Sequence, residues 1–213
     1  MSNAPETTTA AETTVKTAVK PAEPKAISVA RRAAAVSWKP ALFAVLMWVS
    51  AAAGQIPIPG TPVPITLQTF VVMLAGLMLT WRQAGAAVAA YLAAGAAGLP
   101  VFAGGASTMA LVGPSAGFLL GFLPGVVVIA LLRGNGPKGP KGKPASILTA
   151  LRYFAAAILG GVVVVYAFGI LIQSTLTGLP VAAVTAASMG FIIGDIVKAF
   201  VASLAAAGLA RLR

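Results

Sequence analysis

Long apolar runs, separated by short polar connections, occupy the chain from about residue 41 to its end. A helix needs about 20 apolar residues to cross a bilayer perpendicular to its plane, and several of the runs are shorter than this. We therefore expect an all-α integral membrane protein with six transmembrane helices, some of which borrow residues from the flanking loops. The six runs are Ala41 to Gly54, Leu67 to Leu79, Ala84 to Leu99, Pro114 to Leu132, Tyr153 to Leu176 and Val181 to Leu209.

Basic residues fall in alternate connections between these runs. The connections QIPIPGTPVPIT, PVFAGGASTMALVG and STLTGLP contain no Lys or Arg. Lys and Arg accumulate on the cytoplasmic side of membrane proteins, so the pattern predicts that both termini are cytoplasmic. The basic residues that carry this prediction are Arg31, Arg32, Lys39, Arg82, Arg133, Lys138, Lys141, Lys143, Arg152, Arg211 and Arg213.

Composition supports the same fold class. Of the 213 residues, 59% are hydrophobic and 9% are charged, whereas a soluble domain carries about 25% charged residues. The formal charge of +11 could indicate nucleic-acid binding, but the basic residues flank apolar runs instead of forming a stripe on a soluble fold. The chain has no cysteine and no histidine. We therefore expect no disulfide, no metal site, no cofactor and no enzyme activity.

Residues 1–35 differ from the rest of the chain, since they are rich in Ala, Thr, Pro and mixed charge without a sustained apolar face. Such a segment is typical of a disordered tail. It also lacks the order of basic, apolar and small residues that marks a secretory signal. We expect a disordered cytoplasmic tail over residues 1–35 and one membrane domain over residues 36–213.

The connection GNGPKGPKGKPAS suggests a phosphate-binding loop but does not have its spacing. Lys143 is followed by Pro144 instead of Ser or Thr, and Pro137 stands where the first glycine of the motif belongs. We interpret this segment as a flexible basic linker. No other nucleotide motif occurs in the sequence, so we expect the chain not to hydrolyse ATP by itself.

Two of the uncharged connections are candidates for a lid over an outward-facing cavity. The first is stiffened by four prolines, which fix the backbone angle φ and remove N–H donors. The second, VFAGGASTMALVG, combines glycines with Phe102 and Met109, so its backbone could approach a ligand closely. The prolines are Pro57, Pro59, Pro62 and Pro64.

Glycines recur every four residues in the fourth run, at Gly117, Gly121 and Gly125, and again at Gly190 and Gly194 in the sixth. Small residues at this spacing allow helices to approach closely. We expect these glycines to serve helix packing and not ligand contact.

One charged pair lies inside the last apolar run, in the segment FIIGDIVKAF. Asp195 is the only acidic residue after Glu23, and Lys198 follows it on the same helical face. Charged residues inside a membrane are costly and usually face a cavity or each other. The pair could hold the helix in place, relay a proton or bind a ligand. We favour a ligand, because a buried ion pair is often no more stabilising than an apolar pair.

Four segments in order resemble the BioY family, the biotin-specific substrate-binding (S) components of energy-coupling factor (ECF) transporters. They are VPITLQTFVVMLAGLML (63–79), YLAAGAAGLPVFAGG (91–105), GPSAGFLLGF (113–122) and GDIVKAF (194–200). The resemblance covers nearly the whole chain from about residue 36. It implies the six-helix S-component fold in the plasma membrane of a bacterium or archaeon. It further implies high-affinity binding and uptake of biotin.

The resemblance also implies site residues and partners. Asp195 and Lys198 would be polar contacts to biotin, Asp195 accepting hydrogen bonds and Lys198 donating them. Gln68, Tyr91 and Phe102 fall in segments near the family's pocket. The expected partners are a transmembrane coupling protein and two ATP-binding-cassette ATPases. The outer loops would close over the bound biotin before the loaded protein reorients in the membrane.

The sequence departs from the family in three places. The second outer loop carries Ala106 to Met109 where the family often has glycine, and Phe118 stands where an aromatic hydroxyl is common. Trp48 follows Ala44 where an A-x-x-x-A surface is usual, so no docking face for the coupling protein is assigned.

A stand-alone biotin facilitator, an ion or proton channel using Asp195 and a membrane enzyme remain as alternatives. If the last helix starts at Pro180, Asp195 lies about 22 Å along it, so either the helix starts later, near Ala187, or the cavity is deep.

Overall fold

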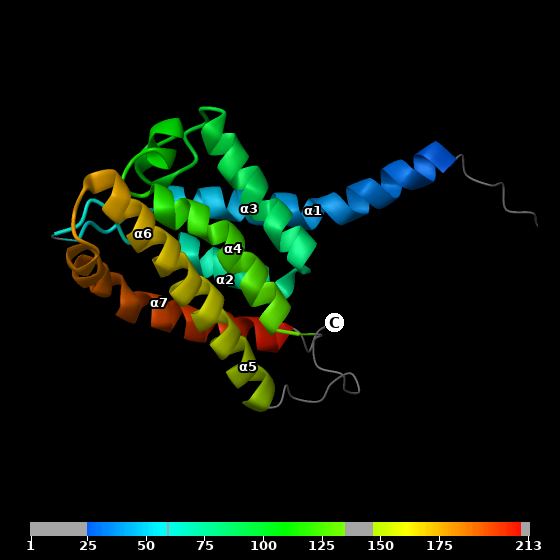
Figure 1. Cartoon of the computed structure of the whole chain (residues 1–213). Helices are drawn as coiled ribbons and strands as arrows, with labels where there is room; N and C mark the ends of the chain where they lie inside the picture. Colours follow the sequence, from blue (N-terminus) through cyan, green and yellow to red (C-terminus); the bar gives the residue numbers. More distant parts are fainter. Residues whose placement is uncertain (1–24, 59, 135–146, 210–213) are drawn as a thin grey trace, which may run out of the picture.

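The computed structural model describes residues 25–58, 60–134 and 147–209, and these residues form an all-helical fold (Figure 1). The one β-type pairing among them is an isolated bridge between Ile56 and Ile65 in the connection QIPIPGTPVPIT, which we name the first outer loop after its predicted side of the membrane. The long elements are α1 (Lys25–Ala52), α2 (Gln68–Met78), α3 (Trp81–Ala96), α4 (Ala116–Leu132), α5 (Ile147–Ala157), the π-helical segment η3 (Ile158–Val164), α6 (Val165–Thr177) and α7 (Val181–Leu209). Two 3-10 turns, η1 (Ala103–Gly105) and η2 (Thr108–Leu111), lie in the connection PVFAGGASTMALVG, which we name the second outer loop in the same way.

Each apolar run predicted from the sequence contains a helix, although the bounds differ. α5, η3 and α6 follow one another without a break, so residues Ile147–Thr177 form one helical rod. This rod and α7 are long and apolar enough to cross a membrane by length and composition. The all-α fold class is therefore confirmed, whereas six membrane crossings and cytoplasmic termini stay predictions.

The last part of the expected tail is helical, whereas the division into a tail and a membrane domain stays a prediction. α1 begins at Lys25, inside the segment 1–35 that we expected to be a tail. Its first turns are rich in alanine, the residue with the highest helix propensity. Residues 1–24 and the basic linker at 135–146 lie outside the described residues, so the expectations for them remain untested.

α4 is the central element of the bundle. It packs against α2 and α3 on one side and against η3 and α6 on the other, while α7 packs against α2 and α5 (Figure 1). The N-terminal part of α1 extends beyond the other helices. The bundle therefore brings α2, α4, α6 and α7 around a shared interior.

Glycines on α4 allow its close approach to η3 and α6. A Cβ atom added at Gly117 would lie 2.5 Å from the carbonyl oxygen of Phe168, and one at Gly125 would lie 2.7 Å from that of Gly160. The packing role predicted for this glycine series is thus confirmed. On α7 the result is mixed, because a Cβ at Gly190 would meet Ile58 at 3.3 Å but one at Gly194 would meet nothing within 4 Å.

We predict that Gly125→Ala lowers the free energy of unfolding by about 1–3 kcal/mol, because the added methyl group overpacks the contact between α4 and η3. Gly194→Ala is the matched control, since Gly194 is also helical but its added methyl group would meet no atom within 4 Å. The measurement is thermal unfolding of the purified protein in detergent. A Gly125→Ala protein as stable as Gly194→Ala would contradict the close packing of α4.

Candidate functional site

A cavity of about 210 Å³ opens inside the bundle beneath the two outer loops. Pockets for drug-sized ligands have volumes of roughly 300–1,000 Å³, so this smaller cavity favours a ligand smaller than a typical drug. Its wall combines the first outer loop, the start of α2, the second outer loop, α4, α6 and α7. Among the residues that line it are Gln55, Pro62, Pro64, Thr66, Gln68, Thr69, Phe102, Phe118, Leu119, Phe122, Tyr166, Phe191, Asp195 and Lys198.

The polar end of the cavity is built around the ion pair of α7. Lys198 Nζ lies 2.8 Å from Asp195 Oδ1, and it also donates to the Thr66 carbonyl at 2.8 Å and to Thr69 Oγ1 at 3.0 Å. An ammonium group has three N–H donors, so these contacts use all of them. Lys198 therefore connects α7 to the end of the first outer loop and to α2.

Asp195 is 3% exposed, and both of its oxygens accept hydrogen bonds. Oδ1 accepts from Lys198 and from the Thr69 hydroxyl, each at 2.8 Å. Oδ2 accepts from the Tyr166 hydroxyl, also at 2.8 Å. A carboxylate offers about four acceptor positions, so these three donors leave roughly one position, on Oδ2, for a ligand.

Gln68 supplies an amide on the α2 side of the cavity. Its Oε1 accepts from the Thr66 hydroxyl at 3.1 Å, and its Nε2 donates to the hydroxyl of Tyr91. Tyr91 in turn donates to the carbonyl of Val101 at 3.1 Å. Because Nε2 carries two hydrogens, one N–H of Gln68 remains for a ligand.

Phe102 closes the cavity from the second outer loop. Its ring meets that of Tyr91 edge to face, with 5.2 Å between centroids, and lies against Gly95 of α3, where a Cβ would overlap it. Thr108 also donates to the carbonyl of Ala96 at 3.2 Å. The second outer loop is thus fastened to α3 at several points.

The two outer loops meet above the cavity. In the first, Ile56 and Ile65 exchange two backbone hydrogen bonds of 2.9 Å, and Pro62 and Pro64 face the cavity. In the second, Gly104 takes a left-handed conformation with φ of 69°. A Cβ there would approach the Gln55 side chain to 3.1 Å, so the glycine allows the loops to touch.

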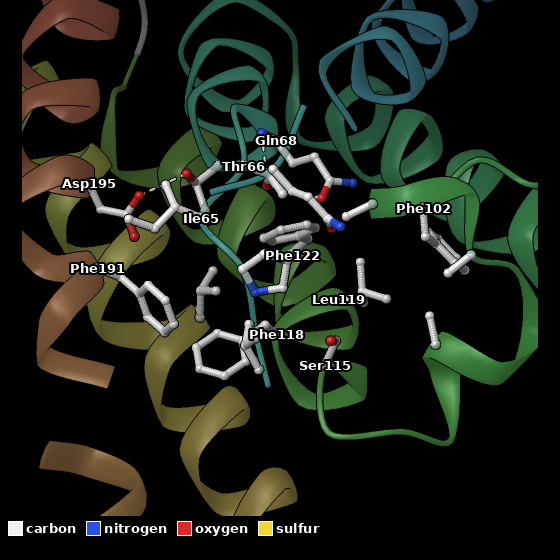
Figure 2. Close-up of a pocket in the computed structure, with 18 of the residues that line it drawn as sticks. Ile65, Thr66, Gln68, Phe102, Ser115, Phe118, Leu119, Phe122, Phe191 and Asp195 are labelled. Carbon is white, nitrogen blue, oxygen red and sulfur yellow. Dashed lines mark hydrogen bonds between the residues drawn. The ribbon is translucent and has the colours of Figure 1, made fainter. Parts of the chain in front are cut away.

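Aromatic and aliphatic side chains form the rest of the wall. Figure 2 shows Phe118, Leu119 and Phe122 of α4 between Asp195 and Phe191 on one side and Phe102 on the other. Phe118 contacts Phe191 edge to face at 6.1 Å between ring centroids. The cavity therefore has a charged end on α7 and a largely apolar body.

Four of the five predicted site residues line this one cavity, namely Gln68, Phe102, Asp195 and Lys198. Tyr91 does not line it and lies behind Gln68, which it holds by a hydrogen bond. Sequence reasoning missed Thr66, Thr69 and Tyr166. Their hydroxyl groups lie within or beside apolar runs, and in a membrane such groups require a partner, which is the signal that could have identified them.

The depth of the site is also resolved. α7 begins at Val181, so the suggestion of a later start near Ala187 is wrong. Asp195 lies roughly 21 Å along the helix at 1.5 Å per residue and still lines the cavity. The end of the first outer loop reaches the same level, because Lys198 donates to the Thr66 carbonyl.

Comparisons with known proteins agree with one another. The model of the BioY family matches residues 24–213. The biotin transporter BioY of Rhizobium etli is 38% identical over 169 residues, covering 77% of this chain and 87% of that protein. BioY of Rhodobacter capsulatus is 39% identical over 183 residues, covering 81% and 91%. Among solved structures, the S-component for biotin from an ECF-type ABC transporter superposes with a TM-score of 0.72 at 26% identity, covering 88% of this chain and 94% of that one.

We predict that Lys198→Met destabilises the ligand-free protein by about 2 kcal/mol, because Asp195 then keeps a buried charge without its cation. Breaking a fully buried pair costs about 3–5 kcal/mol, and we expect less here because the Lys198 side chain is 14% exposed to the cavity. The double variant Asp195→Asn/Lys198→Met should recover most of the loss. Unfolding in detergent measures both, and a double variant less stable than Lys198→Met would contradict the prediction.

Proposed function

The chain belongs to the BioY family, and from this premise we propose that it binds biotin in the cavity and serves biotin uptake as the substrate-specific component of an ECF transporter. The observation that carries the proposal is the Asp195–Lys198 pair, buried at one end of a small cavity whose body is apolar. Biotin has the complementary form, with a polar ureido ring at one end and an apolar body.

The ureido ring supplies two N–H groups and one carbonyl. We propose that Asp195 Oδ2, which keeps an acceptor position, receives one N–H. Lys198 would donate to the carbonyl. Because its three N–H groups already have partners, the ligand has to replace one of them, and the bond to Thr69 Oγ1 is the longest at 3.0 Å. Lys198 would thus change partners on binding.

The remaining site residues would orient the ligand. Gln68 lines the cavity from α2 and would donate its second N–H to the ligand, and the rings of Phe102 and Phe118, which also line the cavity, would contact the apolar part of biotin. Tyr91 would support Gln68 from behind instead of touching the ligand. Burial of apolar surface would supply much of the affinity, and the polar contacts would select the ureido ring.

Membrane placement follows from the same family. We propose six transmembrane helices with both termini in the cytoplasm of a bacterium or archaeon, and with the cavity opening outward. The alternation of basic and uncharged connections supports this orientation. The outer loops that meet above the cavity would act as its lid.

The coupling partners are part of the proposal as well. A transmembrane coupling protein and two ATPases would supply energy, as the resemblance to the BioY family implies, and the solved relative is an S-component from an ECF-type ABC transporter. The absence of a nucleotide motif in this sequence supports the need for other chains. An ion channel is disfavoured because the carboxylate of Asp195 is held by three protein donors in a cavity covered by loops.

Binding of labelled biotin to the purified protein in detergent tests the proposal. We expect saturable binding to the wild type, and at least about tenfold weaker binding to Asp195→Asn and to Lys198→Met, because each loses a hydrogen bond to a charged group. Ser203→Ala is the matched control on α7, since this buried hydroxyl donates to the Ala199 carbonyl and does not line the cavity.

No saturable binding to the wild type would remove the proposed function. Normal binding to both charge variants would remove the site assignment alone.

Uptake of labelled biotin by cells that contain this chain without coupling proteins would identify a stand-alone facilitator, whereas uptake only with them would support the ECF mechanism.

A further inference from the structure

Tyr166 is the one cavity residue in the described part of the chain that donates a hydrogen bond to Oδ2 of Asp195. Its hydroxyl donates to Oδ2 at 2.8 Å, while Lys198 and Thr69 both bind Oδ1. The Tyr166 ring is buried and lies edge to face against Phe118, with 5.9 Å between centroids. The ring thus has a fixed place, and the hydroxyl points at a single acceptor.

Tyr166 reaches this place because the buried face of the helix shifts around the helix axis just before it. Along α5 and η3 as far as residue 161, the buried positions are Tyr153, Ala156, Ala157, Gly160 and Gly161. Val162, the next residue, is also buried but lies outside this stripe. Continued at 3.6 residues per turn, this stripe would next bury positions 164, 167–168 and 171.

The residues that follow η3 do not obey this continuation. Phe168 is 43% exposed and Leu171 is 58% exposed, whereas Tyr166, Gly169 and Gln173 are buried. A π-helical turn contains one more residue than an α-helical turn, so each such insertion rotates the following side chains by about 100°. The segment η3 therefore turns Tyr166 toward Asp195.

Tight contacts surround η3 at its two glycines. A Cβ at Gly160 would lie 2.5 Å from the Gly125 carbonyl oxygen on α4, and one at Gly161 would lie 2.6 Å from Cε of Met73 on α2. The backbone of η3 is thus enclosed from two sides. π-Helical turns occur frequently at functional sites, which agrees with this location.

The hydrogen bond has a consequence for the ligand. A carboxylate is planar, so rotation about the bond that joins it to Cβ moves both oxygens together. A donor on Oδ2 therefore adds to the restraint that Lys198 and Thr69 place on this rotation at Oδ1. Tyr166 occupies one acceptor position of Oδ2 and restrains the carboxylate plane from its second oxygen, so the remaining acceptor position on Oδ2 has a defined orientation. Binding to a preorganised acceptor avoids the cost of ordering it.

We propose that Tyr166 is a positioning residue for ligand recognition: it orients Asp195 Oδ2 toward a ligand N–H, and the π-helical segment η3 places it there. The inference rests on the proposed function, since it concerns the same site and the same ligand. Tyr166 acts through Asp195 and needs no contact of its own with the ligand.

Tyr166→Phe tests the inference, because it removes the hydroxyl and keeps the ring that packs on Phe118. We expect biotin to bind about tenfold more weakly, the effect of losing a hydrogen bond to a charged group. Tyr153→Phe is the matched control, since this buried tyrosine belongs to the same rod but does not line the cavity. Its affinity should equal that of the wild type.

Infrared spectroscopy of the ligand-free protein supplies a readout that a packing role would not move. Asp195→Asn identifies the stretching band of the Asp195 carboxylate as the band that disappears, in the wild type and again in the Tyr166→Phe background. We expect this band to shift in Tyr166→Phe and to keep its position in Tyr153→Phe, because carboxylate stretching frequencies depend on the hydrogen bonds accepted.

The outcomes separate the two proposals. If the wild type binds biotin and Tyr166→Phe binds it equally well, the positioning role is overturned while the proposed function stands. Weaker binding with an unshifted carboxylate band also overturns it, since Tyr166 would then act through packing. If the wild type does not bind biotin, the proposed function fails, and an unshifted band would still show that Tyr166 does not act on Asp195.

Discussion

A single buried carboxylate sets the requirements that the surrounding structure meets. An uncompensated charge in an apolar interior costs several kcal/mol, and Asp195 avoids this by accepting from Lys198, Thr69 and Tyr166. These donors come from α7 itself, from α2 and from α6, so the charge can be satisfied only when three helices have their native arrangement. Lys198 adds the carbonyl of Thr66 at the end of the first outer loop. The hydrogen bonds of the polar site and the packing of these helices therefore depend on each other.

Close backbone approach makes that arrangement possible. The glycines of α4 bring it against η3 and α6, where side chains with a Cβ would collide with carbonyl groups. Close contact at this interface also surrounds the π-helical segment, and the segment rotates α6 about the axis of the rod so that Tyr166 faces the cavity. The apolar wall then follows from α4, whose Phe118 and Phe122 face the same space. Backbone contacts far from the charge thus determine which hydroxyl reaches it.

Sequence reasoning recovered the features that have a local signature. The apolar runs predicted where helices form, and a lone Asp–Lys pair in an apolar run predicted the polar end of the cavity. Tyr166 was missed because prediction from a constant period of 3.6 residues fails across η3, which changes the phase without a distinctive motif. Thr66 and Thr69 were missed because their role depends on a contact with α7 more than 120 residues away. Tyr91 was assigned to the pocket, but its direction, toward Gln68 and Val101, depends on tertiary packing.

The distribution of these donors along the chain bears on how the protein is made. α2 and α6 precede α7 in the sequence, so during synthesis Thr69 and Tyr166 emerge before Asp195. In a bilayer, a nascent α7 that carries an aspartate and a lysine is costly to insert next to lipid. If its partners are already in place, the new helix can exchange water directly for protein hydrogen bonds. Because α7 follows α2 and α6 in the chain, it reaches the membrane after the two helices whose hydroxyl groups it needs.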